Sequence, residues 1–334
     1  MKKPFVTLDD VAAAAGMSRA QVSRALRGDP VHPETRERIV KIAAQLNYRP
    51  NLAARSLVSA HSSIVGLLIG DPNNPFHIQL AQAVDRALLA SGFEPVTTLR
   101  SSQDGSVENE VERLLRLRAA GVILLAPAVS AKAISAIGDN LPCVYLGSQR
   151  INHRKVTVIT VDDNAGVRAA VSHLLALGHR RIAHLGGGSE ASARERTKAY
   201  CEVMNEAGLA PFFLRGTHDA ASGRRGVDEL FADPEPPTAI FASNDLLALG
   251  VLDRLKGMGL AVPGDVSVIG FDDIPSAAHS VFSLTTVRQD VHEQARTAVA
   301  ALQDIIDDKA TRQRRQVMPV ELVVRHSSGA LASA

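Results

Sequence analysis

Side chains that can read base edges in DNA occur close together near the start of the chain. Arg19, Ala20 and Arg24 follow Ser18 within one short segment of helix-forming residues. A guanidinium can donate two hydrogen bonds to guanine O6 and N7, and an alanine methyl can pack on the methyl group of thymine. If the segment is a recognition helix, its first turn points these residues at the major groove. The alternative is that the arginines are only the solvated face of a small helical domain.

The elements that must position these side chains are short, capped helices. Thr7 precedes an apolar face at helical spacing, and Ser18 precedes a second helix with Gln21 at the capping-box position. Gly16 separates the two helices, and Pro33 opens a third. Three short helices around one small core, with a glycine-containing turn, predict a helix-turn-helix unit. The residues expected to face its core are Leu8, Val11, Ala12, Ala15, Val22, Leu26, Ile39, Ile42, Ala43 and Leu46.

The charge of the chain is uneven. Residues 1–60 hold ten Lys and Arg against five Asp and Glu, which gives +5, whereas the remainder holds 27 against 30, which gives −3. A basic segment at one end of a chain favours a polyanionic partner, so the charge agrees with double-stranded DNA. Residues 51–57 follow Pro50 and are too short to be a stable helix alone, but such a segment can fold on contact with DNA. Leu57 beside Arg55 has the chemistry of a minor-groove wedge, and the alternative is a plain linker.

From Ile64 onward, short apolar runs alternate with helical patterns, which is the rhythm of βαβ units. Near-continuous apolar strands predict parallel sheets covered on both faces, and about 270 residues suit two doubly wound lobes. Ligands collect beyond the carboxyl ends of such strands. We therefore expect a cleft between the lobes, lined by the polar loops that follow strands, at 71–77, 186–196, 243–245 and 271–273.

Motifs for catalysis or cofactor binding are missing from the sequence. Gly186, Gly187 and Gly188 do not form either phosphate-loop pattern, so they are expected to serve a tight turn from strand to helix. The cysteines Cys143 and Cys201 support neither a disulfide framework nor a zinc site. The N-terminus has no signal-peptide pattern and no apolar run approaches the ~18 residues that span a bilayer. We expect a cytoplasmic protein that is not an enzyme and needs no metal or cofactor.

The chain resembles the lactose-repressor family of bacterial transcription factors over essentially its whole length. The resemblance rests on Gly16-Met17-Ser18, Val22-Ser23-Arg24, Leu46-Asn47-Tyr48-Arg49-Pro50-Asn51, Ser243-Asn244-Asp245 and Gly270-Phe271-Asp272-Asp273, among others. It implies a homodimer that binds a near-palindromic operator, with paired hinge helices in the minor groove. The DNA-binding positions that it implies are Thr7, Ser18, Arg19, Ala20, Ser23, Arg24, Asn51, Arg55 and Leu57.

The resemblance also implies a periplasmic-binding-protein-like α/β domain that holds an allosteric effector between its lobes, a sugar or a sugar acid. Two residues depart from the family pattern, because His218 stands where an aromatic is frequent and Glu190 where a hydroxyl or basic residue is common. The C-terminus lacks the heptad leucines of a tetramer contact. The effector-binding positions that the resemblance implies are Phe76, His77, Leu125, Ser192, Arg196, His218, Asn244, Asp272 and Gln289.

The expected organisation is a DNA-binding domain at 1–50, a hinge at 51–61 and an effector-binding and dimerisation domain at 62–334. Its first lobe is expected at 62–161 and 288–318, and its second at 162–287 and 319–328. The leading hypothesis is a sequence-specific DNA-binding regulator, a repressor. One alternative is a solute-binding protein without a regulatory role, and another is a cytoplasmic nucleotide-dependent enzyme. The missing signal peptide argues against the first, and the missing phosphate loop against the second.

Overall fold

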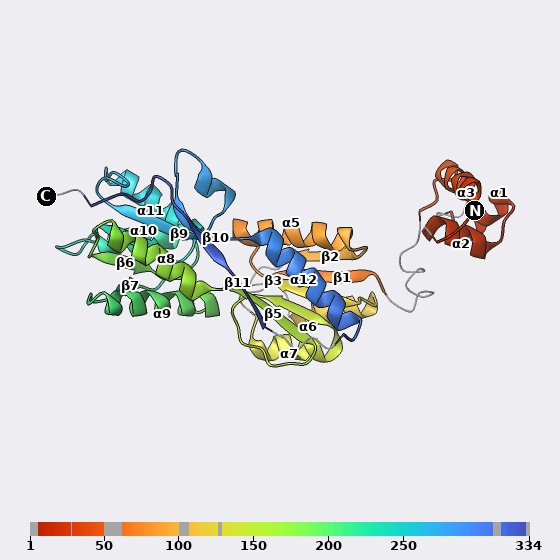
Figure 1. Ribbon diagram of the computed structural model, residues 1–334, viewed down its shortest axis with the longest axis horizontal. Coiled ribbons are helices and arrows are strands. Elements are labelled where there is room, and N and C mark those ends of the chain that lie inside the picture. Colours follow the sequence, from red (N-terminus) through yellow and green to blue (C-terminus); the bar gives the residue numbers. More distant parts are fainter. Residues whose placement is uncertain are drawn as a thin grey trace. The chain divides into compact units, whose positions relative to one another are not determined.

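A computed structural model describes residues 6–27, 29–49, 62–99, 107–125, 129–309 and 315–331. The chain divides into two units, Met1–Ser62 and Ser63–Ala334, and each has its own buried core (Figure 1). The predicted hinge residues Asn51, Arg55 and Leu57 lie outside the described residues.

The N-terminal unit contains three helices, as the capping residues predict. Thr7 and Asp10 form a reciprocal capping box, and Gly16 ends the first helix in the left-handed conformation, with φ of 63°. Ser18 Oγ accepts from Gln21 N at 3.3 Å, while Gln21 Oε1 accepts from Ser18 N at 3.2 Å. The helices are α1 (Leu8–Ala15), α2 (Arg19–Arg27) and α3 (Pro33–Gln45). Their core is Val11, Ala12, Ala15, Val22, Ala25, Ile39 and Ala43, with Leu8, Leu26, Ile42 and Leu46 packed against it.

The larger unit contains two six-stranded sheets, and all strand pairs of the first sheet are parallel. Its central strands are buried on both faces, as their apolar runs predict. In spatial order the strands are β11 (Arg315–Met318), β5 (Val156–Val161), β4 (Cys143–Leu146), β3 (Gly121–Leu125), β1 (Ile64–Ile69) and β2 (Glu94–Leu99). The helices of this part of the chain are α5 (Pro75–Ala90), α6 (Val107–Arg116), α7 (Ala131–Asn140) and α12 (Val291–Ile306).

The second sheet is parallel except at one edge. Its order is β12 (Val320–Val323), β10 (Thr285–Gln289), β9 (Ser267–Asp272), β8 (Ala239–Ala242), β6 (Ile182–Leu185) and β7 (Phe212–Leu214). β12 runs antiparallel to β10, so the expectation of parallel sheets fails at this strand. The helical elements around this sheet are α8 (Asp163–Ala176), α9 (Ala191–Glu206), α10 (Ala220–Leu230), α11 (Asp245–Gly257) and the short 3₁₀ helix η1 (Pro275–Ala278).

The chain passes between the two sheets at three places, which lie next to one another. The passages follow Val161, Gln289 and Met318. Met318 pairs with Val161 in the first sheet, and Gln289 pairs with Val320 in the second. Asp162 N also donates to Met318 O at 2.9 Å. The three connections are therefore joined by backbone hydrogen bonds.

Candidate DNA-reading surface and ligand cavity

The predicted base-reading residues lie on the outside of α2. Arg19, Ala20 and Arg24 are exposed, as is Ser18 at the start of the helix, whereas Ser23 is half-buried. The Arg19 guanidinium lies 3.6 Å from the Asp9 carboxylate, and both side chains are about two-thirds exposed, at 64% and 66%. Exposed ion pairs are weak, so this contact leaves Arg19 able to turn to another partner. Thr7 is also exposed, and its hydroxyl is engaged in the capping box of α1.

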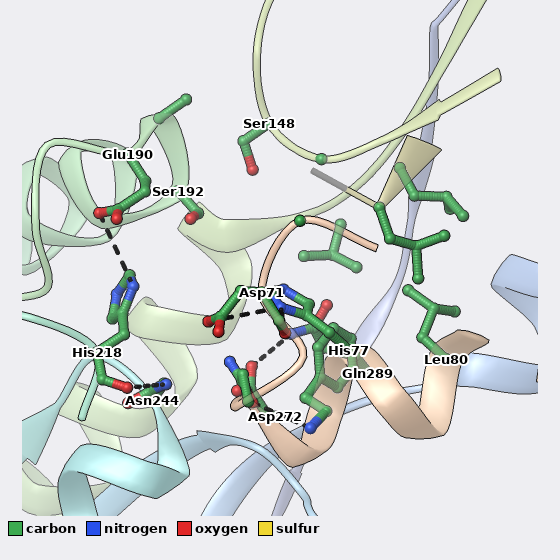
Figure 2. Close-up of a pocket in the computed structure, with 18 of the residues that line it drawn as sticks. Asp71, His77, Leu80, Ser148, Glu190, Ser192, His218, Asn244, Asp272 and Gln289 are labelled. Atoms are coloured by element: carbon green, nitrogen blue, oxygen red, sulfur yellow. Dashed lines mark hydrogen bonds and ion pairs between the residues drawn. The ribbon is translucent and has the colours of Figure 1, made fainter. Parts of the chain in front are cut away.

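The larger unit contains a cavity of about 490 Å³ at the carboxyl ends of strands from both sheets. All nine predicted effector residues line it. Gly70 and Asp71 follow β1, Leu125 ends β3, Asp272 ends β9 and Gln289 ends β10. This is the position where polar loops of parallel sheets were expected to meet. The apolar side of the cavity includes Phe76, Leu80 and Leu125, and Figure 2 shows the polar groups that face them.

Arg196 is the only Lys or Arg among the described residues that line the cavity, and it is buried. Its Nε donates to Asp163 Oδ1 at 2.8 Å and its Nη1 to Ser243 O at 2.6 Å. Its Cζ lies 3.6 Å from the ring centroid of Phe271, a cation–π contact. A buried guanidinium is tolerated only when it is paired and hydrogen-bonded, so these partners fix its position. No bond from Nη2 to a described protein atom is seen.

Asp272 is held beside Arg196 at the end of β9. Gln289 Nε2 donates to Asp272 Oδ1 at 2.7 Å, and Arg196 Nη1 lies 3.8 Å from the same oxygen. Burial raises the pKa of this carboxyl well above its usual value, although Arg196 opposes the shift. Asp272 and Asp273 both have positive φ, 125° and 57°, a conformation that costs a non-glycine residue free energy. The strained turn places the Asp272 side chain in the cavity.

Two histidines lie on different sides of the cavity (Figure 2). His77 Nδ1 is 3.2 Å from Asp71 O and 3.8 Å from Asp71 Oδ2. His218 Nδ1 is 3.9 Å from Glu190 Oε2. Burial lowers the pKa of His218 to about 4, helped by Arg196, and burial also lowers the pKa of His77. Both rings are therefore neutral near pH 7, and both contribute polar atoms to the cavity.

Two of the three glycines after β6, Gly187 and Gly188, are required by close packing that the sequence did not indicate. None of the three has positive φ. A Cβ on Gly187 would lie 1.9 Å from His218 Nε2, and a Cβ on Gly188 would lie 2.7 Å from Glu190 Oε2. The expectation that these glycines serve a tight turn therefore does not account for them fully. At these two positions, a side chain would occupy the space that His218 and Glu190 fill.

Asn244 and Ser192 lie in two of the segments that were expected to follow strands, and the structure places Asn244 just before α11 and Ser192 in the first turn of α9. Asn244 Oδ1 accepts from Leu247 N at 3.0 Å, so the residue is the N-cap of α11. Its Nδ2 lies 3.5 Å from His218 O, at the limit of a hydrogen bond, and Asn244 also lines the cavity. A capping role and a ligand-facing role are thus combined in one side chain.

Several residues of the cavity were missed by the sequence reasoning. Ser148 Oγ donates to Asp163 Oδ2 at 3.0 Å, and Thr160 Oγ1 lies 3.4 Å from Ser148 Oγ. Asp163 thereby joins Arg196 on α9 to Ser148, which follows β4 of the first sheet. Because Asp163 opens a helix directly after the buried strand β5, its position was the available signal. Other lining residues that were not singled out are Tyr145, Gly147, Thr217, Asp219, Leu246 and Gln294.

The part of the chain that the structure describes shows neither a membrane-spanning helix nor a metal site. None of the helices in that part of the chain is both long and apolar enough to cross a membrane. Nor do the residues that the structure describes include a group of His, Cys, Asp and Glu suited to a metal ion.

Comparison with known proteins decides the family. Residues 7–51 match the family described as bacterial regulatory proteins, lacI family, and residues 171–328 match a periplasmic binding protein-like domain. The chain is 33% identical to the HTH-type transcriptional regulator GalS of Salmonella typhimurium, over 97% of this chain and 96% of that protein. The chain belongs to the lacI family of bacterial regulatory proteins. This confirms the resemblance on which the predicted positions rest.

Solved structures of lacI-family proteins cover nearly the whole chain. The regulator is similar to the Lac repressor dimer bound to operator and the anti-inducer ONPF, with a TM-score of 0.85 and 30% identity over 98% of this chain and 100% of that one. It is also similar to a complex of the transcriptional regulator CelR with cellobiose, with a TM-score of 0.73 and 30% identity over 97% and 100% of the two chains. The predicted fold class is confirmed. The family consists of DNA-binding transcriptional regulators, so this chain is such a regulator and not an enzyme or a plain solute-binding protein.

Proposed function

We propose that this regulator is a repressor whose affinity for operator DNA is set by a small polar ligand in the cavity of the larger unit. The observation that carries the proposal is that nine residues, chosen from the sequence as effector positions, line this one cavity. The Lac repressor binds ONPF and CelR binds cellobiose in the structures compared above, which supports a sugar or sugar derivative as the ligand here. A volume of about 490 Å³ agrees with a ligand of that size.

For the DNA side, we propose that Arg19, Ala20 and Arg24 read base edges while Thr7, Ser18 and Ser23 contact the DNA backbone. The exposure of the first three on α2 supports this assignment. Two copies of the chain would place two such units on a near-palindromic operator. Asn51, Arg55 and Leu57 are assigned to the hinge on the family resemblance alone. Because operator DNA lies in the cytoplasm of a bacterium, that is the proposed location.

For the organisation, we propose the limits 1–50 for DNA reading, 51–61 for the hinge and 62–334 for effector binding and dimerisation. The lobes are proposed at 62–161 with 288–318, and at 162–287 with 319–328. The strand composition of the two sheets supports this division, since every strand except β10 lies within one of these sets of residues. β10 (Thr285–Gln289) belongs to the second sheet and extends two residues beyond position 287.

A substitution that fills the cavity with a large side chain tests whether ligand binding changes the affinity for operator DNA. Ser192 lines the cavity and is half-buried, so Ser192→Phe should occupy ligand space while every residue of the DNA-binding unit stays unchanged. The operator is first selected from random DNA, and its affinity is measured by fluorescence anisotropy with neutral sugars, amino sugars, sugar acids and purines. Allosteric coupling of ~1–3 kcal/mol changes operator affinity by roughly 5- to 150-fold. We expect one class of ligand to change the operator affinity of the natural chain by such a factor. Ser192→Phe should bind operator with the affinity of the natural chain, and no ligand should change that affinity.

The matched control is Ser189→Phe, the same change at an exposed position that does not line the cavity. This variant should keep both operator binding and the ligand response. If every class of ligand left operator affinity unchanged in the natural chain, ligand control would be refuted while DNA binding would stand. If Ser192→Phe responded like the natural chain, the effector would bind elsewhere.

A further inference from the structure

Glu190 is an N-cap carboxylate that does not cap its helix. It occupies the N-cap position of α9, yet its side chain accepts no hydrogen bond from the helix. Asp162, Asp219 and Asp290 at other N-caps of this chain do accept such bonds, as the shorter aspartate usually does at this position. Figure 2 shows the Glu190 carboxylate turned toward His218. The residue lines the cavity instead of stabilising α9.

This end of the cavity has acceptors without donors. Glu190 Oε2 and His218 Nε2 are both buried and have no hydrogen-bond partner in the described part of the chain. The distance of 3.9 Å from Glu190 Oε2 to His218 Nδ1 is too long for a hydrogen bond. A carboxylate only accepts, and a neutral imidazole with its proton on Nδ1, toward Glu190, accepts at Nε2. Leaving such atoms unpaired costs free energy, so the ligand is expected to supply donors.

The two side chains have little room to turn away. As described above, Gly187 and Gly188 lie so close to His218 Nε2 and Glu190 Oε2 that a Cβ on either glycine would clash. The polar atoms are thus packed against the backbone of the loop after β6. The close packing therefore fixes the positions of the Glu190 and His218 side chains, unlike those of exposed side chains, which can adopt several rotamers.

The charge around the cavity also selects against an anion. Besides Asp272, whose pKa is raised by burial, the described lining residues include three carboxylates, Asp71, Glu190 and Asp219, and a single guanidinium, that of Arg196. That guanidinium is already paired with Asp163 at 2.8 Å. A ligand carboxylate would therefore meet no uncompensated cation, whereas a ligand cation would meet a carboxylate, Glu190, that has no ion partner within hydrogen-bond distance.

We propose that the effector carries an amino group bound by Glu190, so that the ligand class is amino sugars and related polyhydroxylated amines and not sugar acids. This inference rests on the proposed function, because it assumes that the cavity holds the effector. An ammonium group offers three donors and one positive charge, which matches an unpaired carboxylate. The ring hydroxyls would be left to Asn244, Asp272 and Arg196.

The test compares three sugars that share one ring but differ in charge: the neutral sugar, its amine and its uronate. Isothermal titration calorimetry on the full chain uses glucose, glucosamine and glucuronate, and the same series for galactose. We expect at least one amine to bind tenfold or more tightly than its neutral parent, and the two uronates not to bind. Glu190→Gln keeps the shape of the side chain but removes its charge, so it should reduce the preference for the amine to about parity. Added salt should weaken amine binding by the natural chain more than by this variant.

The matched control is Glu195→Gln, the same change on α9 at an exposed position that does not line the cavity, and it should keep the full preference. Tighter binding of a uronate than of its amine would overturn the inference, as would an amine preference that survives in Glu190→Gln, or binding by neutral sugars with none by amines. If one of these results is obtained and a sugar still changes operator affinity, the inference about the amine is wrong but the proposed function is supported. If no ligand of any charge class shifts operator affinity, ligand control itself fails.

Discussion

His184 is a fully buried titratable residue whose protonation should be visible in the stability of the larger unit. Its Nδ1 lies 3.0 Å from Phe241 O and its Nε2 3.0 Å from Thr197 Oγ1, and the ring stacks on Phe241 with centroids 5.0 Å apart. Burial lowers its pKa from 6.5 to about 4. The ring is thus kept neutral in the folded chain while it would titrate normally in the unfolded chain.

This difference predicts the direction of a pH effect. Between pH 6.5 and about 4 the unfolded chain binds a proton at His184 that the folded chain does not, so the contribution to stability is present above 6.5 and is lost on acidification. The loss amounts to about 3 kcal/mol. Burial raises the pKa of Asp245 to about 6, which gives the opposite trend. The measurement is therefore the difference in free energy of unfolding between the natural chain and His184→Gln, at pH 7 and at pH 4.5.

The natural chain should lose stability relative to His184→Gln as the pH falls, because glutamine can still donate to Phe241 O but binds no proton. A constant difference between the two proteins across this range would show that the buried ring does not resist protonation.

The effector positions that the family resemblance supplied line one cavity, but the sequence did not supply the partners of these residues. Arg196 was identified, whereas its pairing with Asp163 was not. The two residues are 33 positions apart, and they lie on different helices, Asp163 at the start of α8 and Arg196 in the second turn of α9. Only the packing of α8 against α9 brings them together. Glu190 was recognised as unusual in type, but its failure to cap α9 depends on a side-chain conformation that no pattern encodes.

At the level of elements, α10 and α11 pack backbone against backbone through two glycines. A Cβ on Gly250 would lie 2.0 Å from Ala220 O, and a Cβ on Gly223 would lie 2.2 Å from Leu247 O. Both positions are buried, and the atoms that they would strike are backbone atoms that cannot rotate away. The close approach of these helices therefore requires glycine at both positions.

We expect Gly250→Ala to lower the free energy of unfolding by about 1–3 kcal/mol, because overpacking forces the helices apart. The control is Gly257→Ala at the end of the same helix, where the nearest atom to a new Cβ is Arg254 Nη1 at 3.9 Å. That exposed change should be neutral or stabilising by roughly 0.5–1 kcal/mol. Urea denaturation of the two variants checks both values. Equal effects would mean that the helices can separate without cost.

Elements with strong local signals were predicted and those without them were not. The capped helices α1 and α2 begin where their capping residues predicted, and β1 begins at Ile64, where the first apolar run was expected. The short strands β11 and β12 were missed because they lie at sheet edges, alternate between exposed and half-buried residues, and contain charged side chains. Their pairing with β5 and β10 is a consequence of tertiary structure, and so is the antiparallel direction of β12.

At the level of the whole molecule, the two units have separate cores. The clusters of the larger unit contain no residue before Ile64, and that of the smaller unit contains none after Tyr48. We expect a chain without residues 1–61 to fold, to bind ligand as the full chain does, and to lose operator binding. Circular dichroism, calorimetry and anisotropy measure the three properties. Loss of ligand binding in this chain would contradict the independence of the units.

The three adjacent passages between the sheets restrict the motion that any ligand can drive. Two sheets joined by a single connection could rotate relative to each other in every direction. Three connections that are joined by backbone hydrogen bonds leave this relative rotation few degrees of freedom. Rotation about an axis through this triple connection is the one that strains it least. Val161 and Gln289 belong both to the connections and to the cavity lining. A ligand that fills the cavity would therefore contact the pivot itself, and a small change in its contacts would be converted into a change of the angle between the two sheets.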